Sequence, residues 1–178
     1  PDIVKKYKSL GFEIHLIKNY AVHLGLNDSS FSEVGAKIVN DENELIKNSD
    51  ILVQLDMLSE NQMSLMKENQ TLIGSFNKHL NSDKIKKLLS KSINIFSLEL
   101  LPRITRAQSM DILSSQANLA GYKAVIESFS YFEKAIPMMM TAAGTIPAAK
   151  VLVVGAGVAG LQAIATSKRM GAIVFATD

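Results

Sequence analysis

One stretch near the end of the printed sequence limits the possible folds more than any other. Residues 150–154 (Lys-Val-Leu-Val-Val) have the pattern of a buried strand and run directly into Gly155-Ala-Gly157-Val-Ala-Gly160. We expect a helix over residues 161–170 and a second strand over residues 172–176. A strand, a glycine turn, a helix and a second strand in direct succession form a βαβ unit, which predicts an α/β fold with parallel strands.

The three glycines have the spacing of a dinucleotide-binding turn. Gly155 permits the tight turn, Gly157 lets the backbone approach a pyrophosphate, and Gly160 lets the helix pack closely on the strand. The N–H groups at the start of the helix then face the phosphates. Asp178 follows the second strand, where a carboxylate accepts hydrogen bonds from an adenosine ribose and repels a 2′-phosphate. The pattern therefore predicts a dinucleotide site that favours NAD over NADP.

The residues before this stretch alternate between helical and strand patterns. Expected helices cover residues 3–10, 43–47, 59–68 and 82–89, with a further short helix capped by the Ser30–Glu33 spacing. Met63 and Met66 are expected to face inward from the helix over residues 59–68. Expected strands cover residues 12–17, 37–39, 51–55, 71–76 and 93–98, and the strand over residues 51–55 is expected to be buried. Strands separated by helices predict a mostly parallel sheet with helices on both faces.

The middle of the chain, residues 107–150, does not continue this alternation of helices and strands. Residues 107–134 carry a long helical pattern, with a possible break near Ser114 or Gly121. Residues 135–150 contain prolines and a glycine and are expected to form an irregular linker. Met138–Met140 within it are expected to pack in a core or between domains rather than to bind a soft metal, since no histidine or cysteine is near.

Composition excludes several classes of function. The chain has 19 basic and 17 acidic residues, so its charge gives no case for binding nucleic acid or an anionic membrane surface. It has no cysteine, and its three histidines (His15, His23 and His79) share no close spacing, so no metal site is predicted. The longest uncharged run, residues 151–167, is short and broken by glycines, so we expect no membrane insertion.

A second polar cluster precedes the linker, over residues 101–116. Arg103 offers a planar fork of donors, Gln108 an amide, and Asp111 a carboxylate. From spacing alone, a capped helix start whose side chains are solvated is favoured over a ligand-binding loop, and both interpretations stay open.

Two long segments resemble signatures of a known family. These are Pro102–Tyr122 (PRITRAQSMDILSSQANLAGY) and Met138–Pro147 (MMMTAAGTIP), the latter followed by the glycine turn. Both resemble the proton-translocating nicotinamide nucleotide transhydrogenases, in the NAD(H)-binding domain of the alpha subunit (domain I). Residues 1–99 are similar to the N-terminal part of that domain in pattern, with weaker local identity.

The resemblance implies an α/β fold of two doubly wound, Rossmann-like domains with parallel sheets, the second truncated. Residues 1–135 would form the N-terminal domain with a long linking helix, and residues 136–178 the start of the NAD(H)-binding domain. In this family the cofactor lies in the cleft between the domains. The resemblance assigns the nicotinamide end to Arg103, Gln108, Asp111 and Ser114. It assigns cofactor contacts to Gly155, Gly157, Val158, Gly160 and Asp178.

The resemblance also implies a reaction and partners. Hydride passes directly between NADH and NADP+, so no side chain serves as acid or base and the enzyme contributes positioning. NADP(H) would lie on a partner domain, and a membrane-embedded subunit would carry protons. A homodimer is expected, at the cytoplasmic side of the inner membrane and attached only through partner subunits.

Two other functions stay open. Alanine dehydrogenase shares the fold and uses a lysine and a histidine in its N-terminal domain. The matching lysine region here, residues 51–57 (ILVQLDM), has no lysine, and Lys78 and His79 do not match the histidine in register. His79 is instead expected to be an exposed loop residue. The third candidate is a regulatory NAD-binding module without turnover.

Overall fold

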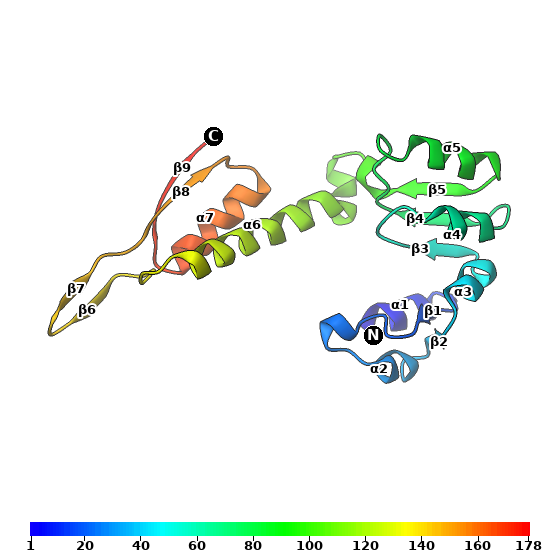
Figure 1. Cartoon of the computed structure of the whole chain (residues 1–178), viewed down its shortest axis with the longest axis horizontal. Helices are drawn as coiled ribbons and strands as arrows, with labels where there is room; N and C mark the ends of the chain where they lie inside the picture. The colour runs from blue at the N-terminus through cyan, green and yellow to red at the C-terminus, as the bar shows by residue number, and fades with distance from the viewer. The chain divides into compact units, whose positions relative to one another are not determined.

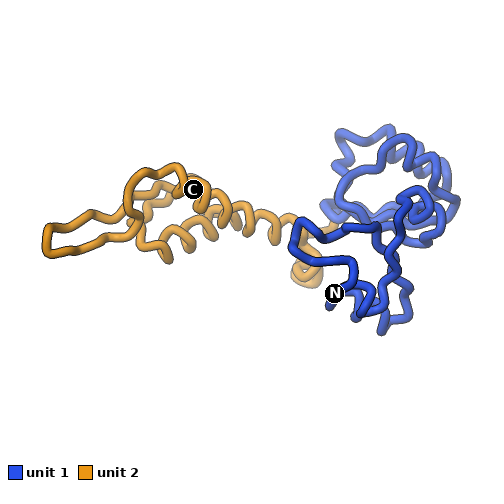
Figure 2. Tube along the Cα trace, turned by 60° about the horizontal axis from the view of Figure 1, so that its bottom comes forward, with its two compact units in different colours: residues 1–100 blue, residues 101–178 orange.

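The computed structural model describes all 178 residues and divides into two compact units. Unit 1 covers residues 1–100 and unit 2 covers residues 101–178 (Figure 2). Parallel strand pairs joined through helices occur in both units, which confirms the expected α/β class. No helix has both the length and the apolar character needed to cross a membrane.

The N-terminal half of unit 1 is a small parallel sheet with its own core. Its elements are α1 (Asp2–Ser9), β1 (His15–Ile17), the 3-10 helix η1 (Val22–Leu24), α2 (Asp28–Ser32), β2 (Lys37–Val39) and α3 (Glu42–Asn48). β1 and β2 pair in parallel, and Val4, Ala21, Phe31 and Ala36 are buried together. The expected Ser30–Glu33 cap is wrong, because α2 begins one turn earlier, after Asn27, and Ser30 lies inside it.

The C-terminal half of unit 1 is a three-stranded parallel sheet (Figure 1). Its elements are β3 (Ile51–Val53), α4 (Glu60–Leu65), β4 (Thr71–Gly74), α5 (Ser82–Ser90), β5 (Asn94–Ser97) and η2 (Leu98–Leu100), in strand order β3-β4-β5. Leu52 and Leu72 pair across the sheet and pack with Met63 and Met66, which face inward as expected. Residues 51–55 are not buried throughout as expected: Leu52 is buried, but Val53 on the opposite face is 77% exposed.

In unit 1, side chains form hydrogen bonds with backbone groups near the ends of helices and strands. Lys91, the residue after α5, donates to the carbonyl oxygen of Met63 at 3.1 Å, near the end of α4. Glu99 accepts the Phe76 N–H after β4 at 3.1 Å. Burial acts to raise the pKa of Glu99, but hydrogen bonds from Ser97, Ser75 and backbone N–H groups outweigh it and lower that pKa overall. The carboxylate therefore stays ionised and fixes this loop.

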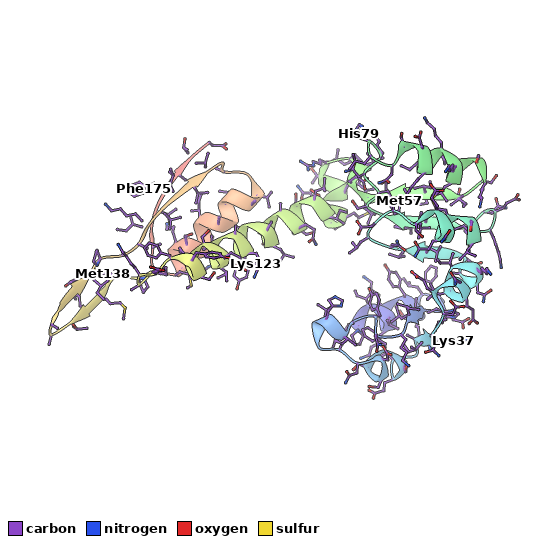
Figure 3. All side chains as sticks on the ribbon, in the orientation of Figure 1. Lys37, Met57, His79, Lys123, Met138 and Phe175 are labelled. Carbon is purple, nitrogen blue, oxygen red and sulfur yellow. The ribbon has the colours of Figure 1, made fainter.

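Unit 2 begins with two helical segments and a hairpin. The long helical pattern is divided into η3 (Thr105–Met110) and α6 (Ile112–Tyr131), with the break at Asp111, which caps α6 and lies three residues before the expected Ser114. β6 (Met139–Thr141) and β7 (Gly144–Ile146) form an antiparallel hairpin where an irregular linker was expected. Met138, labelled in Figure 3, and the next two methionines are exposed, so the expected packing is not made within this chain.

The βαβ unit follows the hairpin. Its elements are β8 (Lys150–Val154), α7 (Val158–Arg169) and β9 (Ile173–Thr177), and the two strands pair in parallel from Lys150 opposite Ile173 to Val154 opposite Thr177. β8 has the predicted bounds, whereas α7 begins three residues earlier than expected. Side chains on one face of this two-stranded sheet, including Leu152 and Phe175, are exposed (Figure 3).

Candidate functional site

The turn between β8 and α7 has a geometry that only glycine allows at two positions. Gly155 has a φ of +97°, a backbone conformation that would strain any residue with a side chain, and its N–H donates to Thr177 O at 2.7 Å. A Cβ atom on Gly160 would overlap the carbonyl oxygen of Gly155 and lie 2.8 Å from its carbonyl carbon. Gly155 therefore allows the turn and Gly160 allows the helix to pack on it, as the sequence predicted.

Gly157 differs because the space beside it is open. A Cβ atom built there would meet no atom within 4 Å. The first hydrogen bond of α7 runs from the Leu161 N–H to Gly157 O at 2.8 Å, so the N–H groups of Val158 and Ala159 have no partner within the helix. An α-helix of 12 residues carries partial positive charge at this end. Free donors beside an open glycine fit an approaching phosphate group.

Asp178 lies against the same turn. Its Oδ1 atom accepts the N–H of Ala156 at 2.8 Å, although the two residues lie 22 apart in sequence. The parallel pairing of β8 and β9 causes this proximity, since both strands end at the same edge of the sheet. The carboxylate is thus beside the glycine turn, where its expected role toward a ribose requires it.

The polar cluster of residues 103–114 forms the start of α6. Asp111 accepts the Ser114 N–H at 3.0 Å and the Ser114 hydroxyl at 2.7 Å. These two hydrogen bonds, in that order, lower the pKa of Asp111, with a smaller contribution from the charge of Arg103. Asp111 therefore caps the helix as an anion. At this residue the cluster is a capped helix start, which is one of the two interpretations that the sequence left open.

Two adjoining hollows bring the glycine turn and the polar cluster together within unit 2. The first, of about 410 Å³, is lined by Arg103, Leu113, Ser114, Ala117, Val154, Gly155, Gly157, Val158, Ala159 and Gly160. The second, of about 580 Å³, is lined by Arg103, Ile104, Thr105, Ala107, Gln108, Asp111 and Ser114. Arg103 and Ser114 belong to both. Every predicted site residue except Asp178 therefore lines one of these hollows. Asp178 is held beside the glycine turn by its hydrogen bond with Ala156.

The packing of α6 against α7 explains how residues about 40 apart in sequence meet (Figure 1). Gly121 is buried on α6, and Asn118 donates to Gln162 of α7 at 3.2 Å. The sequence suggested Gly121 only as a possible break in the helix. No pattern identified Asn118 or Gly121 as contacts, since the partner of each lies on an element far along the chain.

Lys78 and His79, weighed for the alanine dehydrogenase interpretation, lie in the turn after β4. Both are exposed, as expected for His79 (Figure 3). Neither has a hydrogen-bond partner for its side chain in this chain.

Comparison with known proteins defines the class. Residues 1–120 match the family model "Alanine dehydrogenase/PNT, N-terminal domain", and residues 124–178 match "Alanine dehydrogenase/PNT, C-terminal domain". The chain therefore belongs to the alanine dehydrogenase/PNT family. The matched ranges meet inside α6, whereas the compact units divide at residue 100. The boundary at residue 135 stays a prediction.

Within that family the chain is more similar to transhydrogenases. It is 46% identical over 183 residues to the first part of the NAD(P) transhydrogenase alpha subunit of Rhodospirillum rubrum, covering 100% of this chain and 48% of the relative. A solved transhydrogenase structure from Sinorhizobium meliloti matches with a TM-score of 0.93 and 44% identity, over 99% of this chain and 53% of that one. The chain thus spans about half the length of these relatives.

An L-alanine dehydrogenase structure shares the fold at lower identity. It matches with a TM-score of 0.83 and 19% identity, over 100% of this chain and 49% of that one. Together the two structural matches confirm the predicted class, an α/β fold of Rossmann-like domains, and this chain covers about half of each matched chain.

Proposed function

We propose that this chain is the NAD(H)-binding part of a proton-translocating transhydrogenase, which transfers hydride between NADH and NADP+. One observation carries the proposal: the hollow has the free N–H donors of α7 on one side and the Arg103–Ser114 segment on the other. The identity to transhydrogenase alpha subunits supports the same assignment.

The residues of the hollow suit the parts of NAD(H). The pyrophosphate would lie on the turn from Gly155 to Gly160, beside Val158, where nothing blocks its approach to Gly157. Asp178 would accept hydrogen bonds from the adenosine ribose and select NAD over NADP. Arg103, Gln108, Asp111 and Ser114 would hold the nicotinamide end in the second hollow.

The chemistry then requires orientation from this chain rather than acid or base catalysis. The nicotinamide group supplies the hydride when bound. Arg103 and Gln108 are donors on the segment before α6, with Gln108 in the 3-10 helix η3, and Asp111 and Ser114 fix the start of α6 that follows. A segment attached to a fixed helix start can hold a planar ring in one orientation, which is the contribution that direct hydride transfer needs.

The remaining predictions extend this proposal. NADP(H) would bind a partner domain, and a membrane-embedded subunit would move the protons, with this part attached at the cytoplasmic side of the inner membrane. Residues 1–135 and 136–178 are our proposed domains. A homodimer is also proposed, supported by the exposed apolar side chains of the β6–β7 hairpin, among them Met139, Met140 and Ile146.

The test uses the complete native polypeptide and an NADP(H)-binding partner domain. We expect NADPH to reduce an acetylpyridine analogue of NAD only when the partner is present, because this chain has one glycine turn and the reaction needs two cofactors. Reductive amination of pyruvate with ammonia and NADH would instead identify an alanine dehydrogenase. NADH binding without either reaction would identify a regulatory module.

A further inference from the structure

The contact between α6 and α7 is unusually close at one residue beside the hollow. Gly121 is buried in the middle of α6. A Cβ atom there would overlap the carbonyl oxygen of Ala159 and lie 2.8 Å from its carbonyl carbon and 3.0 Å from its Cα atom. The two helices therefore meet backbone to backbone at this point, with no side chain of residue 121 between them.

This contact lies next to the site residues on both helices. Ala159 is the second residue of α7 and lines the first hollow, as does Ala117, one turn before Gly121 on α6. Ser114 lies two turns before Gly121, about 10 Å along the helix axis at 1.5 Å per residue. Because α6 is continuous between them, its distance from α7 at Gly121 determines where Ser114 lies relative to the glycine turn.

We propose that Gly121 is a positioning residue, which sets the distance between the Arg103–Ser114 segment and the glycine turn of α7. This inference rests on the proposed function, since it concerns the same hollow. Asn118 supports the same crossing through its hydrogen bond to Gln162. A side chain at residue 121 pushes the helices apart, and a misplacement of about 1 Å can cost on the order of 100-fold in rate.

A purely local role of Gly121 makes the opposite prediction for stability. Alanine favours a helix over glycine, so Gly121→Ala would raise the unfolding temperature if nothing lay against residue 121. The close approach of Ala159 predicts a lower unfolding temperature instead. The sign of the change therefore separates the two interpretations.

The experiment compares Gly121→Ala with the wild type in the complete native polypeptide. ADP-ribose, which lacks the nicotinamide, probes the glycine turn alone, and we expect its affinity to stay unchanged. We expect the unfolding temperature to fall and hydride transfer to the partner domain, at saturating NADH, to slow about tenfold or more. Ala120→Ser, at the exposed neighbouring position, serves as the control and should change none of the three. A raised unfolding temperature with an unchanged transfer rate overturns the proposal.

A second variant tests the positioning role of the α6–α7 contact if Gly121→Ala does not fold. Asn118→Ala removes the hydrogen bond to Gln162 without adding volume, and we expect transfer to slow about threefold with unchanged ADP-ribose affinity. An unchanged transfer rate in that variant contradicts the positioning role. A wild-type protein that binds neither NADH nor ADP-ribose would contradict the proposed function itself, which is a separate outcome.

Discussion

Backbone groups near the end of α4 and after β4 in unit 1 have side-chain partners, whereas those at the start of α7 in unit 2 do not. In unit 1, Lys91 binds a carbonyl group near the end of α4, and Glu99 binds the Phe76 N–H after β4. In unit 2, the first N–H groups of α7 have no partner in the helix and face a hollow. Unpaired backbone donors at the surface are available to a ligand, whereas paired ones stabilise the fold. The comparison thus favours unit 2 as the site of ligand recognition.

The two units also differ in the size of the side chains that they bury. The largest fully buried apolar side chains, Phe76, Leu58, Leu72 and Leu88, all belong to unit 1. Unit 2 buries small residues, among them Ala107, Gly121 and Ala149. Small residues allow backbones to approach each other or a ligand, but they contribute less apolar area to stability. Substitutions of large buried residues in unit 1 should therefore mainly affect stability, and substitutions at the hollow in unit 2 should mainly affect nucleotide recognition.

The largest expected effect is on the stability of unit 1. Leu72 is 0% exposed and packs between the strands and helices of the core, so Leu72→Ala should lower the free energy of unfolding by about 3 kcal/mol. Val53→Ala, on the exposed face of the same sheet, should change it by less than about 0.5 kcal/mol. Chemical denaturation of the 178-residue chain measures both. Equal losses would show that the core does not lie where the structure has it.

The next largest effect concerns the rate of hydride transfer. Arg103 lines both hollows and is exposed, so Arg103→Ala should leave the fold intact and slow hydride transfer about 100-fold, because ring alignment matters most in the transition state. NADH affinity should fall by a smaller factor. Stopped-flow kinetics with the partner domain and calorimetry with NADH separate the two quantities. Equal losses of rate and affinity would favour a merely structural loop.

A smaller effect is expected at the open glycine. Gly157→Val should lower NADH affinity about tenfold, or about 1.4 kcal/mol, because the branched side chain occupies the approach to the α7 N-terminus. The unfolding temperature should hardly change, since a Cβ atom there meets nothing within 4 Å. Calorimetric titration of the complete polypeptide tests this. Unchanged NADH affinity in the folded variant would contradict the binding of the pyrophosphate at this turn.

The smallest expected effect concerns the choice of nucleotide. Asp178→Ser removes the carboxylate beside Ala156, so NADH should bind about fivefold more weakly and the preference over NADPH should narrow. Competition binding with the two reduced nucleotides measures the preference. A wild-type polypeptide that binds both equally would show that Asp178 does not select between them.

The sequence was informative where a residue pattern acts locally. The apolar run of β8 ends at a glycine that must adopt a positive φ, so its bounds followed directly. α7 began three residues early because Val158 to Gly160 form its first turn, although their sequence reads as part of the glycine turn. The β6–β7 hairpin was missed, because alanine, glycine and threonine at its turn carry no alternating pattern.

The site was only partly predictable for a physical reason. The glycine spacing and Asp178 could be interpreted locally, since a βαβ unit brings them to one edge of the sheet. The Arg103–Ser114 segment was assigned by resemblance, because its meeting with the glycine turn depends on the contact of α6 with α7 at Gly121. A contact between distant elements leaves no periodic signal in either one.

Amide NMR of the complete polypeptide during titration with NADH tests most directly whether unit 2 holds the nucleotide. We predict that the largest shifts occur at the amides of Gly157, Val158, Ala159 and Gly160, which line the first hollow at the start of α7. The amides of β4 and α5 in unit 1 should stay unchanged. Shifts centred on the turn of Lys78 and His79, with the α7 amides unmoved, would contradict a nucleotide site in unit 2.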